Sequence, residues 1–125
     1  MNASALEKLC LGLEGTTTDV KWGNDLCYLV AGKMYCVTGL NAPFTASFKT
    51  TPEEFAQLTE RAGIIPAPYV ARYHWVLVEK AGALKETEWA HFVKQSHQLV
   101  VDGLPGKLKR TLGRPVAKSK VRRAK

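Results

Sequence analysis

The chain has 125 residues, 46% of them hydrophobic, and a formal net charge of +7. This length supports one domain, with or without a tail, and no apolar run approaches the roughly 20 residues of a transmembrane helix. The first residues lack the basic and apolar segments of a signal peptide, so we expect no association with a membrane. Three cysteines without a C-x-x-C pair argue against a disulfide framework and against a zinc site. A reducing, cytoplasmic location fits this cysteine content.

The positive charge is confined to the C-terminal end. Residues 107–125 contain nine basic residues and no acid, whereas residues 1–106 contain nine basic residues and all eleven acids. The first part therefore has a net charge of −2 and the second a net charge of +9. The second part is rich in Gly, Pro, Ser and Ala and has no apolar periodicity, which is typical of disorder. We expect a domain over 1–106 and a basic tail over 107–125, with a short helical turn at 107–112.

A helix is the first element expected along the chain. Ser4 and Glu7 have the spacing of a capping box, which places the helix start at Ser4. The apolar residues that follow at helical spacing are Leu6, Leu9, Cys10 and Leu13. Gly12 and Gly15 weaken the continuation, so we expect the helix to end there. Val20 and Trp22 then alternate with polar neighbours and open a β-rich stretch.

Two runs of strand-forming residues, 26–31 and 33–38, surround Ala31-Gly32 and predict a hairpin. A two-residue type I′ loop would place Cys27 opposite Cys36, within disulfide range, and would require a positive φ at Ala31. A three-residue loop with Gly32 in the left-handed region would place the two cysteines on opposite faces. We favour the second loop because the Cβ atom of Ala31 disfavours positive φ.

The remaining elements follow from clear boundary signals. A third strand is expected around 45–49, and Thr51, Pro52 and Glu54 then start a helix with a capping box. That helix is expected to end at Gly63, before an edge segment interrupted by prolines and a strand at 73–80. The last helix spans about 86–102. The order predicts an α+β fold, α-β(3)-α-β(2)-α, whose antiparallel sheet is packed by helices.

Short motifs occur along this order at particular places. They are Gly15 after a Leu-rich helix, Trp22-Gly23, Val30-Ala31-Gly32-Lys33, Phe48-Lys49-Thr50 before the Thr51-Pro52-Glu53-Glu54 cap, His74-Trp75, Ser96-His97-Gln98-Leu99-Val100-Val101 and Leu104-Pro105. Together they resemble the MmcQ/YjbR family of small bacterial proteins over about residues 4–110. The resemblance implies a fold similar to CyaY and to secretion chaperones. It also implies a DNA-binding label, which rests on a proposed double-wing motif of two hairpins.

No enzyme motif is present in the sequence. The nucleophile elbow, the H-E-x-x-H zinc motif, the P-loop and the dinucleotide fingerprint are all missing. Cys27 and Cys36 lie on expected strands, where buried structural thiols are commoner than nucleophiles. Glu53 and Glu54 fit a helix start better than a catalytic carboxylate pair. We therefore expect no enzymatic activity and no cofactor or metal.

Candidate nucleic-acid contacts occur in the domain and in the tail. Lys33 at a hairpin tip, Lys49 at a strand-to-helix junction and Arg72 between two tyrosines are the domain candidates, and ordinary solvated side chains are the alternative. Trp22 could stack on a base, whereas Trp75 and Trp89 are expected in the core. The tail candidates are Lys107, Lys109, Arg110, Arg114, Lys118, Lys120, Arg122, Arg123 and Lys125.

These observations favour a non-enzymatic protein that binds nucleic acid, DNA rather than RNA, with its affinity mainly from the tail. If six tail cations contacted phosphates, log K would fall with log salt at a slope of about −5. A tail that serves only solubility remains the alternative for these residues. A protein-binding adaptor or chaperone-like module on the same fold is the second hypothesis for the domain. In either case we expect a monomer or a weak dimer.

Overall fold

The structure, a computed structural model, describes residues 1–108, and the part of the tail from Lys109 to Lys125 lies outside this range. The elements in chain order are α1 (Ala3–Leu11), β1 (Thr16–Lys21), β2 (Asp25–Val30), β3 (Lys33–Gly39), β4 (Ala46–Lys49), α2 (Pro52–Leu58), β5 (Ile64–Pro66), β6 (Trp75–Val78) and α3 (Glu86–Asp102). Short 3-10 turns precede β6 and α3. No helix within residues 1–108 is long and apolar enough to cross a membrane.

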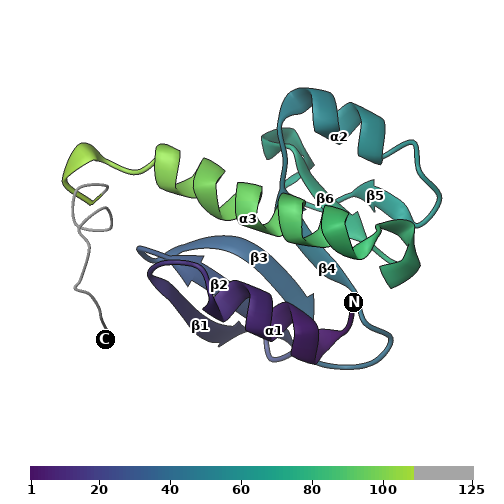
Figure 1. Cartoon of the computed structure of the whole chain (residues 1–125), viewed down its shortest axis with the longest axis horizontal. Helices are drawn as coiled ribbons and strands as arrows, with labels where there is room; N and C mark the ends of the chain where they lie inside the picture. The colour runs from purple at the N-terminus through teal and green to yellow at the C-terminus, as the bar shows by residue number, and fades with distance from the viewer. Residues whose placement is uncertain (109–125) are drawn as a thin grey trace.

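The strands form one antiparallel sheet in the order β1-β2-β3-β4-β6-β5. The helices α1 and α3 lie against one face of this sheet, and α2 lies beside β5 and β6 (Figure 1). The predicted α+β class with an antiparallel sheet is confirmed. The structure has one strand more than expected before α2, because the Thr-rich segment of β1 pairs along the full length of β2.

The core lies between the sheet and the two helices α1 and α3. Fully buried side chains from the sheet meet Trp89 and Val93 of α3 there. The strand residues in this core include Tyr28, Val30, Cys36, Phe48, Val76 and Val78. The Trp89 indole N–H donates a hydrogen bond to the backbone oxygen of Ala81 at 3.0 Å, so its polar atom is satisfied. The predicted core position of Trp89 is confirmed.

The loop of the β2–β3 hairpin differs from the expected one. Ala31 has φ 51° and Gly32 has φ 79°, and Val30 pairs directly with Lys33, which makes a two-residue loop with positive φ at both positions. The three-residue loop was therefore the wrong prediction. The left-handed conformation costs a non-glycine residue about 1–2 kcal/mol, and here the two-residue connection between long paired strands outweighs that cost.

The cysteines nevertheless lie as expected, for another reason. Leu29 pairs with Met34 but Tyr28 pairs with Cys36, so Tyr35 is an extra residue that forms a β-bulge. This bulge shifts the register by one residue and places Cys27 opposite Val37. Cys27 and Cys36 consequently lie on opposite faces of the sheet, and all three cysteines are free and buried.

The predicted cap of α2 is confirmed, whereas the predicted cap of α1 is wrong. The capping box of α2 is present, with Glu54 N–H donating to Thr51 Oγ1 at 3.2 Å and Thr51 N–H donating to Glu54 Oε1 at 3.1 Å. In α1 the cap is Asn2, whose Oδ1 accepts from Ala5 N–H at 2.8 Å, and Ser4 lies inside the helix. The sequence favours Ser4 over Asn2 because Ser4 and Glu7 have the same spacing as a true capping box.

A buried serine joins α3 to the middle of the sheet. The regular β3–β4 pairing ends at Cys36 and Phe48, and the next opposed residues are Tyr35 and Lys49. The Ser96 hydroxyl bridges these two strands, since it accepts from Lys49 N–H at 2.9 Å and donates to the backbone oxygen of Tyr35. Ser96 is fully buried. This bridge fixes the end of β4 and therefore the position of Lys49.

Candidate functional site

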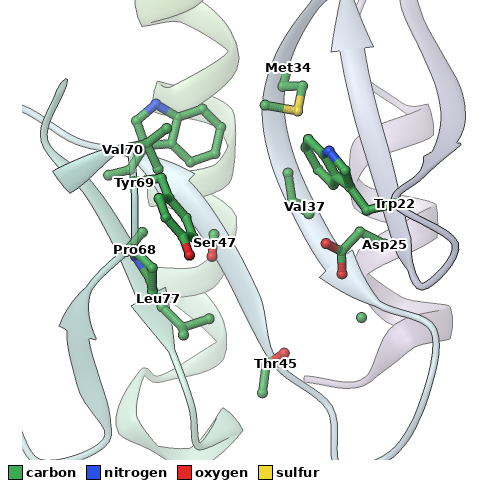
Figure 2. Close-up of a pocket in the computed structure, with 13 residues that line it drawn as sticks. Trp22, Asp25, Met34, Val37, Thr45, Ser47, Pro68, Tyr69, Val70 and Leu77 are labelled. Atoms are coloured by element: carbon green, nitrogen blue, oxygen red, sulfur yellow. The ribbon is translucent and has the colours of Figure 1, made fainter. Parts of the chain in front are cut away.

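The face of the sheet opposite α1 and α3 carries an open groove, which we call the groove from here on. Its volume is about 680 Å³, within the range of ligand-binding clefts. The floor is formed by residues of β3, β4 and β6 that alternate with the core residues, among them Val37, Ser47 and Leu77. The side walls are the β1–β2 turn and the loop before β6 (Figure 2).

Two exposed aromatic side chains mark the two sides of the groove. Trp22, in the β1–β2 turn, is 70% exposed, and Tyr69, in the loop before β6, is 99% exposed. Figure 2 shows Trp22 beside β2 and β3 and Tyr69 on the opposite side, with the groove between them. Large aromatic side chains contribute most to stability when they are buried. Two of them exposed on either side of one apolar groove indicate a surface for a ligand.

Both aromatic residues are held in an unusual backbone conformation. Trp22 has φ 54° and Tyr69 has φ 70°, and they are two of only four non-glycine residues with positive φ among residues 1–108. Bulky residues rarely adopt this region, and such conformations gather at functional sites. The two exposed rings are thus carried by segments whose backbone conformation is unusual for bulky residues.

A cationic cluster lies next to the groove, around the ring of Tyr73. The Arg72 guanidinium carbon lies 4.9 Å from the ring centroid and Lys49 Nζ lies 5.9 Å from it. Lys49 Nζ also donates to the backbone oxygen of Tyr73 at 2.9 Å. In the β4–β6 pairing Lys49 is opposite Trp75, which lines the groove. The structure thus brings two of the three predicted domain cations together.

Burial lowers the pKa of the Lys49 ammonium group, which is only partly exposed. Arg72 is exposed and stacks against Tyr73, so its guanidinium edge is available to an anion. Lys33 does not join this cluster. It lies exposed at the tip of the β2–β3 hairpin and forms no side-chain hydrogen bond or ion pair within residues 1–108.

Of the nine tail candidates, Lys107 alone lies within the described residues. Lys107 is exposed at the end of the described range. The other tail candidates lie outside the described residues, and so does most of the helical turn expected at 107–112. They are Lys109, Arg110, Arg114, Lys118, Lys120, Arg122, Arg123 and Lys125. Their role stays a prediction from the sequence.

The described residues offer few groups that could bind a metal ion or act as a nucleophile. No group of three or more His, Cys, Asp or Glu side chains within 1–108 is arranged to hold a metal ion. Burial raises the pKa of the thiol of Cys27, the residue opposite Val37 in the sheet, and this keeps it protonated at neutral pH. The groove therefore offers aromatic faces, apolar surface, a few polar groups and adjacent cations.

The sequence singled out Trp22 and missed the groove that it flanks. Trp75 was expected in the core, and although it is buried, it also lines the groove. Tyr69 stands out in the sequence only as one of the two tyrosines near Arg72. The available signal was the apolar character of both faces of β2 and β3, where Leu29 and Val37 alternate with core residues. Nothing in the sequence indicates that no helix within residues 1–108 covers the second face.

Comparisons with known proteins agree with this architecture. The YjbR family model matches residues 11–99. The crystal structure of Deinococcus radiodurans protein DR2400, which has a DUF419 domain, is similar with a TM-score of 0.81 and 23% identity, over 91% of this chain and 89% of that one. A Pseudomonas syringae protein is similar with a TM-score of 0.66 and 23% identity, over 79% and 98%. No curated protein matches significantly. The family match confirms the resemblance inferred from the ordered motifs.

Proposed function

We propose that this chain, which belongs to the YjbR family, is a non-enzymatic protein that binds single-stranded nucleic acid in the groove. The observation that supports this proposal most directly is the pair of exposed aromatic side chains, Trp22 and Tyr69, on opposite sides of an open sheet face. Proteins that bind single strands combine aromatic platforms for the bases with positive charge for the backbone. The DNA-binding label implied by the sequence makes single-stranded DNA the first ligand to test.

The surface favours a single strand over a duplex. Bases show their faces to an aromatic side chain only when they are unstacked. A double-wing contact with duplex DNA would instead need cationic hairpin tips that reach the phosphates. The β2–β3 tip offers Lys33 alone, and the β1–β2 turn consists of Trp22, Gly23 and Asn24, which carry no charge.

In this proposal the groove and the tail contact different parts of the nucleic acid. The groove contacts bases, with Lys49 and Arg72 next to it as phosphate contacts. The domain as a whole is mildly acidic, so these two cations cannot supply strong electrostatic attraction alone. The tail, with its excess of nine positive charges, supplies the affinity that depends on salt. We propose a cytoplasmic location for this activity, in line with the free cysteines.

Fluorescence anisotropy of a labelled oligothymidine with the full-length chain tests the proposal. Trp22→Ala and Tyr69→Ala are each expected to weaken binding by about 1–3 kcal/mol, the usual effect of losing one stacked base. Leu11→Ala is the matched control, because Leu11 is an exposed apolar residue on α1, on the other face of the sheet. The control is expected to bind as the unmodified chain does.

A salt series separates the groove from the tail. Replacing the eight basic residues from Lys109 to Lys125 by Gln is expected to flatten the slope of log K against log salt, by about 0.7 for each phosphate that the tail no longer neutralises. Trp22→Ala is expected to lower affinity at every salt concentration and leave the slope unchanged. If the full chain binds no oligonucleotide at about 50 mM salt, the proposal is wrong.

A protein-binding adaptor is the second candidate, and one observation favours it. The strand β1, Thr16–Lys21, is at the edge of the sheet, and no other strand within residues 1–108 pairs with its outer side. Such an edge can accept a strand from a partner. Failure of oligonucleotide binding, together with a partner whose binding is abolished by a proline substitution at Thr18, would support the adaptor instead.

A further inference from the structure

One carboxylate lines the otherwise apolar and hydroxyl-bearing groove. Asp25 is the first residue of β2, and its neighbours in the sheet are Lys21 on β1 and Gly39 on β3. The groove-lining residues include no other acid among the residues that the structure describes. Figure 2 shows its carboxylate next to Trp22, directed toward the middle of the groove.

The Asp25 carboxylate has no partner in the described part of the protein. Its neighbour Lys21 forms an ion pair with Asp19 instead, with Nζ and Oδ2 3.4 Å apart. No hydrogen bond or ion pair within residues 1–108 reaches the carboxylate of Asp25. The group is partly buried at the side of the groove. Its oxygens are therefore free to accept hydrogen bonds from a ligand.

A carboxylate in a nucleic-acid site cannot face the phosphates, because like charges repel. It can face the edge of a base, where carboxylates accept hydrogen bonds from amino groups. The Watson–Crick edge of guanine presents two adjacent donors, N1–H and the N2 amino group, which match the two oxygens of a carboxylate. Adenine, cytosine and thymine each present a single donor group on that edge.

The stacking surface and the carboxylate belong to one short turn. Trp22 and Asp25 are separated by Gly23 and Asn24, and the turn is fixed to the end of β3 by the hydrogen bond from Leu40 N–H to the Asn24 oxygen at 2.8 Å. We infer, on the basis of the proposed function, that the groove prefers guanine, with the base stacked on Trp22 and its Watson–Crick edge bound by Asp25.

A cationic side chain of a protein partner is the competing occupant, since aromatic faces and a carboxylate also suit a cation. The charge of this chain argues against it. Nine basic residues in the tail would repel a cationic partner and attract an anionic one. The same argument favours a nucleic acid, whose phosphates meet the tail while its base meets Asp25.

Competition with the full-length chain tests the preference. Short oligothymidines that carry one central guanine, inosine, adenine or cytosine displace a labelled oligothymidine. The guanine strand is expected to bind most tightly, by about fivefold or more over adenine and cytosine, the lower range for a bidentate contact. Inosine lacks the N2 amino group and keeps N1–H, so it is expected to fall between guanine and the others.

Asp25→Asn removes one of the two acceptors and the charge. It is expected to abolish the guanine preference and leave the binding of plain oligothymidine unchanged or tighter. Asp102→Asn at the end of α3 makes the same change of charge outside the groove and away from Lys21, and is expected to keep the preference.

The outcomes separate the inference from the proposed function. Binding that depends on Trp22 but shows no guanine preference, or a preference that survives Asp25→Asn, overturns the guanine inference and leaves the proposed function standing. The absence of oligonucleotide binding overturns both. Binding of an arginine-rich peptide that is lost in Asp25→Asn would assign the carboxylate to a cationic ligand and would also overturn the inference.

Discussion

Replacing Ser96 is expected to destabilise the fold more than any other change considered below. Its buried hydroxyl bridges β3 and β4 at a point where the two strands no longer bond to each other directly. Ser96→Ala removes the acceptor for Lys49 N–H and the donor to the backbone oxygen of Tyr35. Each buried backbone group that loses its partner costs about 1–3 kcal/mol. Lys49 N–H and the Tyr35 oxygen lie opposite each other and can move partly together in the variant. We therefore expect the free energy of unfolding to fall by about 2–4 kcal/mol in total.

Urea unfolding followed by tryptophan fluorescence measures this loss. With an m value of about 2 kcal/mol per M, the midpoint is expected to fall by about 1–2 M. Ser4→Ala is the matched control, because Ser4 is an exposed serine inside α1, and its midpoint is expected to stay within about 0.3 M of the unmodified chain. A Ser96→Ala midpoint that falls no further than the control would refute the bridging role.

Three further changes test local features of the fold. Asn2→Ala is expected to cost about 1 kcal/mol in urea unfolding because Asn2 caps α1; a loss from Ser4→Ala instead would restore Ser4 as the cap. Burial lowers the pKa of His97 below its ordinary 6.5, so the unfolded chain binds the proton more tightly and stability is lost as pH falls below about 6.5. His97→Gln should remove this pH dependence, and an unchanged dependence would assign it to other groups. The hydrogen bonds from Arg61 lower the pKa of Glu88 to about 2, so the pair contributes above pH 4.5 and its contribution is lost toward pH 2. Because this pair is exposed, Glu88→Gln should cost at most about 1 kcal/mol at neutral pH, and less in high salt; a loss that high salt does not reduce would contradict this.

The sequence predicted those elements whose signals are local. The capping box at Thr51 and the apolar stripe around Trp89 each depend on residues within a few turns of helix, and the structure confirms both. The helix α2 ends at Leu58 rather than at Gly63, because the next residues form tighter i→i−3 turns, from Glu60 N–H to the Gln57 oxygen at 3.3 Å and from Arg61 N–H to the Leu58 oxygen at 3.0 Å. This change from helix to turns is not visible in the periodicity.

The features that the sequence did not predict depend on contacts between distant segments. The bulge at Tyr35 is stabilised by α3 through Ser96, 61 residues further along the chain. The groove forms because β1–β2 and the loop before β6 stand on either side of a sheet face that no helix covers within residues 1–108. Lys49 and Arg72 lie together only because both approach Tyr73. Each of these features requires the tertiary fold, so residue patterns alone could not reveal it.

The indole N–H resonances of the three tryptophans give the most direct test of the proposed nucleic-acid groove. Trp22 and Trp75 line the groove, whereas Trp89 is fully buried in the core and serves as an internal control. On titration of the full-length chain with an oligothymidine that contains guanine, the Trp22 resonance is expected to shift most, Trp75 less, and Trp89 not at all. Binding of the oligonucleotide with no shift at Trp22 would contradict the account, because it would place the contact on the tail or on another face.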